Sequence, residues 1–264
     1  MPNKKSPKNH NAGKELIRFT GGLPEGVDQK QLREMYEEDM RATAADVVPR
    51  LPQIQILHAG ALSFRMPPAE TEDEDVTKKF RGIIVDKHRC NAYWEQSFQE
   101  SGGGVPPNCS SLDGEIGIMD GGDSRECLTC PFNEFGSASD DNGEKTRGKA
   151  CKNMIRIHIM MDGHQLPRRL TLPPTSLKSA DEYFSRLIDL GVPMTSVITE
   201  FSLIEAKSKQ GISYSQIQMN RVDQIPFERY IQIKKFLQLH QQQIRGQEIK
   251  AEEYEPAETE DVAE

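Results

Sequence analysis

The stretch Met154-Ile-Arg-Ile-His-Ile-Met-Met161 decides the fold class, because apolar residues occupy every second position along it. Successive side chains of a β-strand point to opposite faces, so this alternation is typical of a strand with one face in the core. The same period of two is found over residues 54–56, 62–66 and 170–172, and residues 80–85 are expected to form a compact apolar strand. Residues 197–219 are expected to form a second hairpin with its turn at residues 207–211. The chain is therefore expected to be rich in short strands.

Three helices are expected around these strands. Apolar residues recur at steps of three and four over residues 28–48, which end before Pro49. Ser179-Ala-Asp-Glu182 reads as a capping box that opens a short helix, and Pro226 precedes a last helix over about residues 227–244. Strands and helices do not alternate regularly, which argues against a parallel α/β sheet. The expected fold is mainly β with flanking helices (α+β), an OB-like barrel interrupted by a zinc-binding insertion at about 101–152.

Charge divides the chain into three regions. The 264 residues include 33 Lys and Arg against 41 Asp and Glu, a net charge of −8, and residues 247–264 alone carry eight acids and one lysine. We expect a flexible basic arm over 1–26, the OB-like nucleic-acid-binding domain over 27–246 and a disordered acidic tail over 247–264. No apolar run approaches the ~20 residues of a membrane span, so a membrane role is not expected. The five cysteines are an odd number, which argues against a complete disulfide framework, and a reducing cytoplasm is therefore the expected compartment.

Four of the five cysteines lie in or at the edge of the glycine-rich insertion, as Cys109, Cys127, Cys130 and Cys151. A Cys-x2-Cys pair with two further thiolates can complete the tetrahedral shell that Zn²⁺ prefers, and zinc would order a segment that has no apolar core. We predict one structural Zn²⁺ on these four thiolates, with Cys90 as the alternative to Cys109. A thioredoxin-like pair would need a βαβ setting, and a zinc deaminase would need His-x-Glu, which the sequence lacks.

Basic and aromatic residues are interleaved over residues 78–94 and beside the insertion. Proteins that bind single strands use cations to follow phosphates and aromatic faces to stack bases. The alternative for each aromatic residue is a place in the core. The candidate nucleic-acid-binding residues are Lys79, Arg81, Lys87, Arg89, Tyr93, Trp94, Arg147, Lys149, Lys152, Arg156, Arg169, Lys207, Lys209 and Tyr214.

Four segments together carry a family resemblance: residues 80–85 (FRGIIV), 91–94 (NAYW), 127–137 (CLTCPFNEFGS) and 148–153 (GKACKN). They resemble proteins of phages and mobile elements that are associated with single-stranded DNA. An OB-like barrel with a cysteine-ligated zinc module is similar to phage helix-destabilising proteins and to the large subunit of replication protein A. The acidic tail resembles the partner-recruiting tails of bacterial single-stranded DNA-binding proteins, but it lacks their terminal hydrophobic pair.

The resemblance implies a non-enzymatic single-stranded DNA-binding protein of replication or recombination, in a bacterial or phage-infected cell. Its acidic tail would compete for the DNA groove or recruit replication and recombination proteins. The alternative is a zinc-ordered protein-interaction or transcription-regulatory module. An enzyme such as a nuclease ranks last, because no carboxylate cluster, His pair or nucleophile–base motif stands out in the sequence.

Overall fold

A computed structural model of the chain describes residues 28–44, 50–57, 62–67, 75–96, 105–139, 143–207 and 213–249. The chain divides into two compact units, residues 1–49 and 50–264. The first unit contains α1 (Gln29–Ala44), which confirms the helix expected from Asp28 onward. The Asp28 side chain caps this helix, because its Oδ1 accepts a hydrogen bond from the Gln31 backbone N–H at 2.8 Å. The predicted arm over 1–26 lies outside the described residues.

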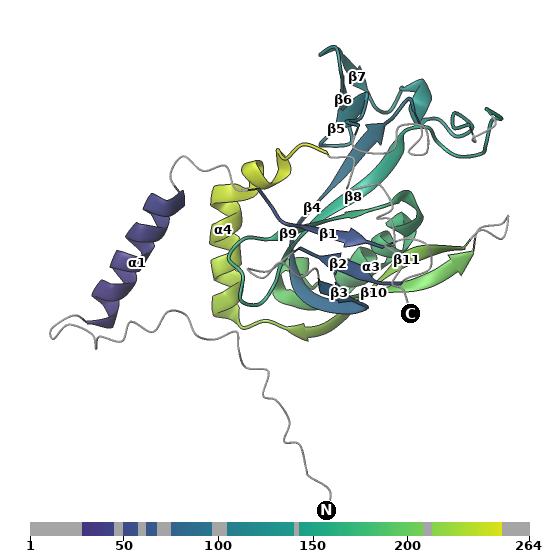
Figure 1. Cartoon of the computed structure of the whole chain (residues 1–264). Helices are drawn as coiled ribbons and strands as arrows, with labels where there is room; N and C mark the ends of the chain where they lie inside the picture. Colours follow the sequence, from purple (N-terminus) through teal and green to yellow (C-terminus); the bar gives the residue numbers. More distant parts are fainter. Residues whose placement is uncertain are drawn as a thin grey trace, which may run out of the picture. The chain divides into compact units, whose positions relative to one another are not determined.

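The second unit is mainly β with flanking helices, as expected (Figure 1). Its strands are β1 (Gln53–Ile56), β2 (Phe64–Met66), β3 (Asp75–Thr77), β4 (Lys79–Tyr93), β5 (Cys109–Ser111), β6 (Ile116–Met119), β7 (Ser124–Glu126), β8 (Lys152–Met160), β9 (Arg168–Leu172), β10 (Val197–Lys207) and β11 (Ser213–Gln224). Its helices are α3 (Leu177–Asp189) and α4 (Phe227–Arg245), with the short 3-10 turns η1 (Pro131–Asn133), η2 (Pro174–Ser176) and η3 (Met194–Ser196).

The strands form one open mixed sheet in the order β3-β2-β1-β9-β8-β4-β5-β6-β7, and β10 joins it through β4 and also pairs with β11. Only β1 and β9 run parallel; every other pair is antiparallel. The expected hairpins over 54–66 and 197–219 are present as β1–β2 and β10–β11. Among the described strands, β3 and β11 do not pair with each other, so the sheet is not closed into a barrel by hydrogen bonds.

The 15-residue strand β4 connects all parts of the sheet. Its first residues, Lys79–Gly82, pair with β10, and the rest pairs with β8 and finally with β5. An irregularity between Ile84 and Asp86 shifts its register against β8. A side chain at Gly82 would collide with Ile159, so glycine permits the close approach of the two strands. The expected strand over 80–85 is thus confirmed, but it continues to Tyr93.

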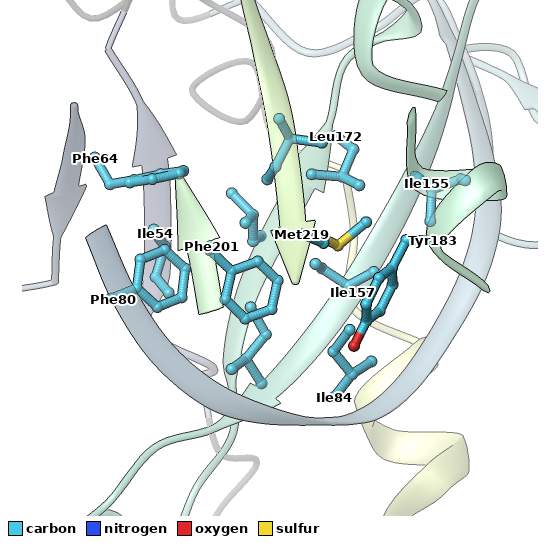
Figure 2. Close-up of a cluster of buried hydrophobic side chains, with 14 of the residues drawn as sticks. Ile54, Phe64, Phe80, Ile84, Ile155, Ile157, Leu172, Tyr183, Phe201 and Met219 are labelled. Atoms are coloured by element: carbon cyan, nitrogen blue, oxygen red, sulfur yellow. The ribbon is translucent and has the colours of Figure 1, made fainter. Parts of the chain in front are cut away.

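The main core lies between the curved sheet and α3 (Figure 2). Phe80 stacks on Phe201 with ring centroids 4.7 Å apart and meets the edge of Phe64 at 4.9 Å. The apolar residues of β8 that alternate in the sequence, Ile155, Ile157 and Ile159, all point into this cluster. A hydroxyl pair, Tyr183 Oη and Thr199 Oγ1 at 2.6 Å, is buried beside it. The period of two in residues 154–161 therefore does create one face of the core.

Helix α4 covers the opposite face of β4 and β8 (Figure 1). Its Ile233, Leu237 and Ile244 pack with Ile83, Val85 and Met160 of the two strands, together with Leu51 and Ile225. This second cluster explains why β4 carries buried residues on both faces over 83–86. No helix in the described parts of the chain is long and apolar enough to cross a membrane.

The predicted capping box at Ser179 is wrong. Helix α3 begins at Leu177, after the η2 turn, and Ser179 lies within its first turn. The Ser179 hydroxyl donates to the Ile217 carbonyl of β11, so it ties the helix to the sheet rather than capping it. Ser176 also bonds β11, because its Oγ accepts from the Ile217 N–H at 3.0 Å. Tertiary contacts therefore fix this helix start.

Candidate metal centre and nucleic-acid face

The four predicted zinc ligands line one cavity. Cys109 comes from β5, Cys127 and Cys130 follow β7, and Cys151 directly precedes β8. The cavity has a volume of about 20 Å³, which is room for about one water-sized particle. All five cysteines are free thiols, and Cys90 is buried with Ala92, Met154 and Ile249 instead of lining this cavity. The structure therefore brings together the four thiols that the spacing selects.

Backbone hydrogen bonds hold the cysteine loops in place. The Cys127 N–H donates to the Glu115 carbonyl at 2.7 Å, and the Cys151 N–H donates to the Phe132 carbonyl at 2.8 Å. Asn133 Nδ2 donates to the Cys127 carbonyl at 2.7 Å. Gly117 leaves the space that the sulfur atoms occupy, because a Cβ there would lie 2.8 Å from Cys109 Sγ. We call residues 105–151 the cysteine module.

The surroundings of the cavity raise the pKa of two of its thiols, Cys109 and Cys151. Burial raises the pKa of Cys151 to about 12, and the charges of Cys127, Cys130 and Cys109 add to this effect. Burial and the same neighbours also raise the pKa of Cys109. Without a cation Cys109 and Cys151 therefore favour the protonated thiol, whereas a bound divalent ion would stabilise thiolates in the cavity.

A different group has the tightest arrangement of ligand atoms. In the described part of the chain, only Asp86, His88 and His158 place three ligand atoms within 4.8 Å of one another, and this group could hold a metal ion. The sequence alone does not reveal this group, because His158 lies 70 positions after His88 and the β4–β8 register brings the two histidines together. Burial lowers the pKa of His158 to about 4. Burial of Asp86 opposes its ionisation, but contacts with His158, His88 and Arg245 hold its pKa well below the ordinary range.

The two aromatic residues predicted to stack bases are engaged with the protein. Tyr93 stacks on Phe132 with centroids 4.2 Å apart and lines the cysteine cavity. Trp94 donates its indole N–H to the Val105 carbonyl at 3.0 Å and packs against the cluster that contains Cys90. Both rings thus take the core-like alternative that the sequence left open.

An aromatic residue outside the predicted set is exposed instead. Phe135, which follows the Cys-x2-Cys pair, is 83% exposed, and Lys149 Nζ lies 4.9 Å from its ring centroid. Lys149 is oriented by Asn133 and Asn153, whose side-chain oxygens accept from it at 3.1 and 3.0 Å. Arg147 lies exposed in the same module, and Lys152 is half-buried, with its pKa lowered by burial. The sequence does contain a signal for this exposed ring: Phe135 is an aromatic residue in a glycine-rich segment that cannot form an apolar core of its own.

The predicted cations on β4 are exposed, but each of them already contacts an acidic or aromatic side chain of the protein. Lys79 and Arg81 both contact Glu200 of β10, at 3.7 and 2.8 Å. Arg89 Nη2 donates to both carboxylate oxygens of Asp181 at 2.9 Å, and Lys87 Nζ lies over the Phe184 ring at 4.7 Å. At the far hairpin Lys207 is exposed, Tyr214 is half-buried and Lys209 lies outside the described residues.

Two predicted phosphate contacts are buried. Arg169 is 4% exposed, and its Nη2 donates to Gln53 Oε1 at 3.4 Å. Arg156 has no exposed surface, because residues 247–249 cover it and the carbonyls of Gln247 and Glu248 accept from its guanidinium at 2.6 and 3.3 Å. Of the predicted acidic tail, the structure describes residues 247–249, which pack on the sheet with Ile249 only 5% exposed; the rest of the tail lies outside the described residues.

Comparisons with known proteins add no relative: no family model, curated protein or solved structure matches this chain.

Proposed function

We propose that this chain is a non-enzymatic single-stranded DNA-binding protein whose contact surface is centred on the cysteine module. The observation that carries this proposal is the exposed Phe135 ring with the Lys149 ammonium beside it. An aromatic face with a neighbouring cation is the combination that stacks an unpaired base and attracts its phosphate. We further propose that the open curved sheet is a partly open OB-like barrel, which would present the module at one end of β4 and β8.

One structural Zn²⁺ would organise this surface through Cys109, Cys127, Cys130 and Cys151. The donor set fits zinc, because four sulfur ligands suit a closed tetrahedral site with bonds of about 2.3 Å. The four thiols line one small cavity that would admit a single ion. Their spacing is wider than that of the Asp86 group, so zinc binding would draw the loops together and fix Phe135.

The paired cations of β4 would contribute less than those of the module. Lys79, Arg81 and Arg89 already contact acids, so a phosphate must compete with Glu200 and Asp181 for them. Lys149 and Arg147 face no such carboxylate partner in the hydrogen bonds and ion pairs of the described residues. We therefore place the first phosphate contacts at Lys149 and Arg147.

The C-terminal segment would regulate access to the sheet. Residues 247–249 cover Arg156, and the acidic residues that follow them carry negative charge like a nucleic-acid backbone. A tethered anion of this kind competes with DNA at a high effective concentration. When it is displaced it would be free to recruit replication or recombination proteins in the cytoplasm of a bacterial or phage-infected cell.

The proposal is tested by fluorescence anisotropy of a labelled oligo-dT with the full chain. We expect binding that weakens as salt rises, because phosphate contacts release counterions. Phe135→Ala should weaken binding about 5- to 150-fold, the range for loss of one base stack. Phe227→Ala is the matched control, since Phe227 is also exposed but lies on α4. Absence of oligo-dT binding, or equal effects of the two variants, would refute the proposal.

A second function is favoured by one further residue. Leu128, between the two cysteines of the Cys127–Cys130 pair, is 91% exposed. An exposed leucine in the same module as an exposed phenylalanine is also suited to contact with another protein. A zinc-ordered protein-interaction or transcription-regulatory module would keep the zinc but show no oligo-dT binding, so the same titration separates the two functions.

A further inference from the structure

Asp86, His88 and His158 lie together on the face of the sheet that α4 covers. The irregularity in β4 places Asp86 directly opposite His158 of β8, and His88 follows two positions later on the same face. Their side chains are 3%, 6% and 0% exposed. The register of two strands thus buries one carboxylate and two imidazoles at a single point.

The spacing of the three side chains suits a metal ion better than a hydrogen-bond network. Asp86 Oδ2 lies 3.4 Å from His88 Nδ1 and 3.6 Å from His158 Nδ1. Tetrahedral ligands with bonds of about 2.0–2.1 Å are separated by about 3.3–3.4 Å, close to these distances. By contrast, 3.6 Å is too long for a hydrogen bond.

His158 is the second indication of a ligand. Neither of its ring nitrogens has a hydrogen-bond partner among the described residues, although the side chain is completely buried. A buried polar atom without a partner costs about 1–3 kcal/mol, so such atoms call for a bound water or ion. An ion between the three side chains would supply a partner for one nitrogen of each histidine.

The surroundings provide support and access. Asp86 Oδ1 accepts from Gln241 at 2.9 Å and from Arg245 at 2.7 Å, both from α4, and ligating carboxylates are commonly held by such outer hydrogen bonds. Asp86 also lines a groove of about 420 Å³ between α4 and the η3 turn, which offers a route for an ion. Arg245 Nε lies 3.0 Å from Oδ2 and adds positive charge, so this site should bind more weakly than four thiolates.

We propose that Asp86, His88 and His158 bind a divalent first-row transition ion, with Zn²⁺ as the probe. Imidazole and carboxylate ligands together suit zinc and its neighbours in that row. The site is separate from the cysteine cavity, shares no residue with it and does not depend on DNA binding.

The test is a Zn²⁺ titration of the full chain, followed by metal analysis and by ¹⁵N NMR of the imidazole nitrogens. Two equivalents should bind, and the second should shift one ring nitrogen of His88 and one of His158. His158→Gln should lose only the second equivalent, whereas the control His164→Gln, at an exposed histidine that contacts Arg168, should keep both.

The NMR measurement on the unaltered chain keeps the proposal testable if His158→Gln fails to fold. Cys127→Ser should weaken the first equivalent and leave the histidine shifts intact, which distinguishes this site from the cysteine module. Imidazole nitrogens that do not move at saturating Zn²⁺, or a second equivalent that persists in a folded His158→Gln variant, would overturn the proposal.

Discussion

Replacing Ile249 with alanine should release the C-terminal segment from the sheet. Ile249 packs with Cys90, Ala92 and Met154, and Trp94 lies against the same cluster. The other described ties of the segment are polar: Arg156 donates to two carbonyls, and Gln247 Oε1 accepts from the Leu51 N–H at 3.3 Å. Ile249 is therefore the one apolar anchor of residues 247–249.

The magnitude follows from the burial of this side chain. A fully buried isoleucine contributes about 1.5–3 kcal/mol, and alanine retains only part of it. A loss of about 2 kcal/mol lowers the ratio of docked to released segment about 30-fold. The segment follows helix α4, so this loss of free energy should weaken the docking of the segment rather than destabilise the whole sheet. The free energy of unfolding should then change much less than for a residue of the main core.

Trp94 reports the release directly, because it is the only tryptophan of the chain. In Ile249→Ala its emission should shift to longer wavelength, and its quenching by iodide should increase. Arg156 becomes accessible at the same time, so oligo-dT should bind more tightly, by up to about 30-fold if docking and DNA exclude each other. Leu239→Ala, at an exposed position on α4, is the control. Unchanged Trp94 emission together with unchanged oligo-dT affinity would refute the reasoning.

Three further predictions concern the metal, the tail and the core. Cys127→Ser/Cys130→Ser should lose one equivalent of zinc by elemental analysis while the far-UV circular dichroism of the sheet is retained; full zinc retention would contradict the cysteine site. Deleting residues 250–264, which carry a net charge of −6, should tighten oligo-dT binding at low salt, with a gain that shrinks as salt rises; an unchanged affinity at low salt would leave the tail only a recruiting or solubilising role. Tyr183→Phe removes the buried hydrogen bond to Thr199 and should lower the free energy of unfolding in urea by about 1 kcal/mol, because the Thr199 hydroxyl loses its partner; a neutral effect would mean that this bond adds nothing net.

Local patterns predicted the parts of the fold that local chemistry controls. The alternation over 154–161 reflects a strand with one face in the main core, and the Cys-x2-Cys pair with two distant cysteines does line one cavity. The extension of β4 beyond Val85 was not visible, because the irregularity after Ile84 breaks the period of two where polar residues begin. The start of α3 was misplaced because contacts with β11 outweigh a local capping pattern.

The roles of single charged and aromatic residues depended on contacts far along the chain. Arg156 reads as a surface cation in its own segment, yet its partners lie 91 and 92 positions away. The sequence alone does not distinguish Trp94 from Phe135 as a base-stacking residue. The fold does, because Trp94 packs against a buried cluster whereas Phe135 is exposed. The Asp86 group needs the β4–β8 register, which no spacing within one strand reveals.

The way the cysteine module is attached has a consequence for how this protein can be altered. Asn91 and Ala92 of β4 stand opposite Asn153 and Lys152 of β8, so the two ends of the module, whose strands β5–β7 extend the sheet beyond β4, join neighbouring positions of β4 and β8. Among the described residues of 94–151, none belongs to the buried residues of the main core or of the α4 cluster. Two antiparallel strands in this arrangement can be joined by a two-residue turn such as Asn-Gly. We expect that deleting the module and joining β4 to β8 by such a turn would leave the remaining strands of the sheet folded. Other protein segments could then be inserted at this position.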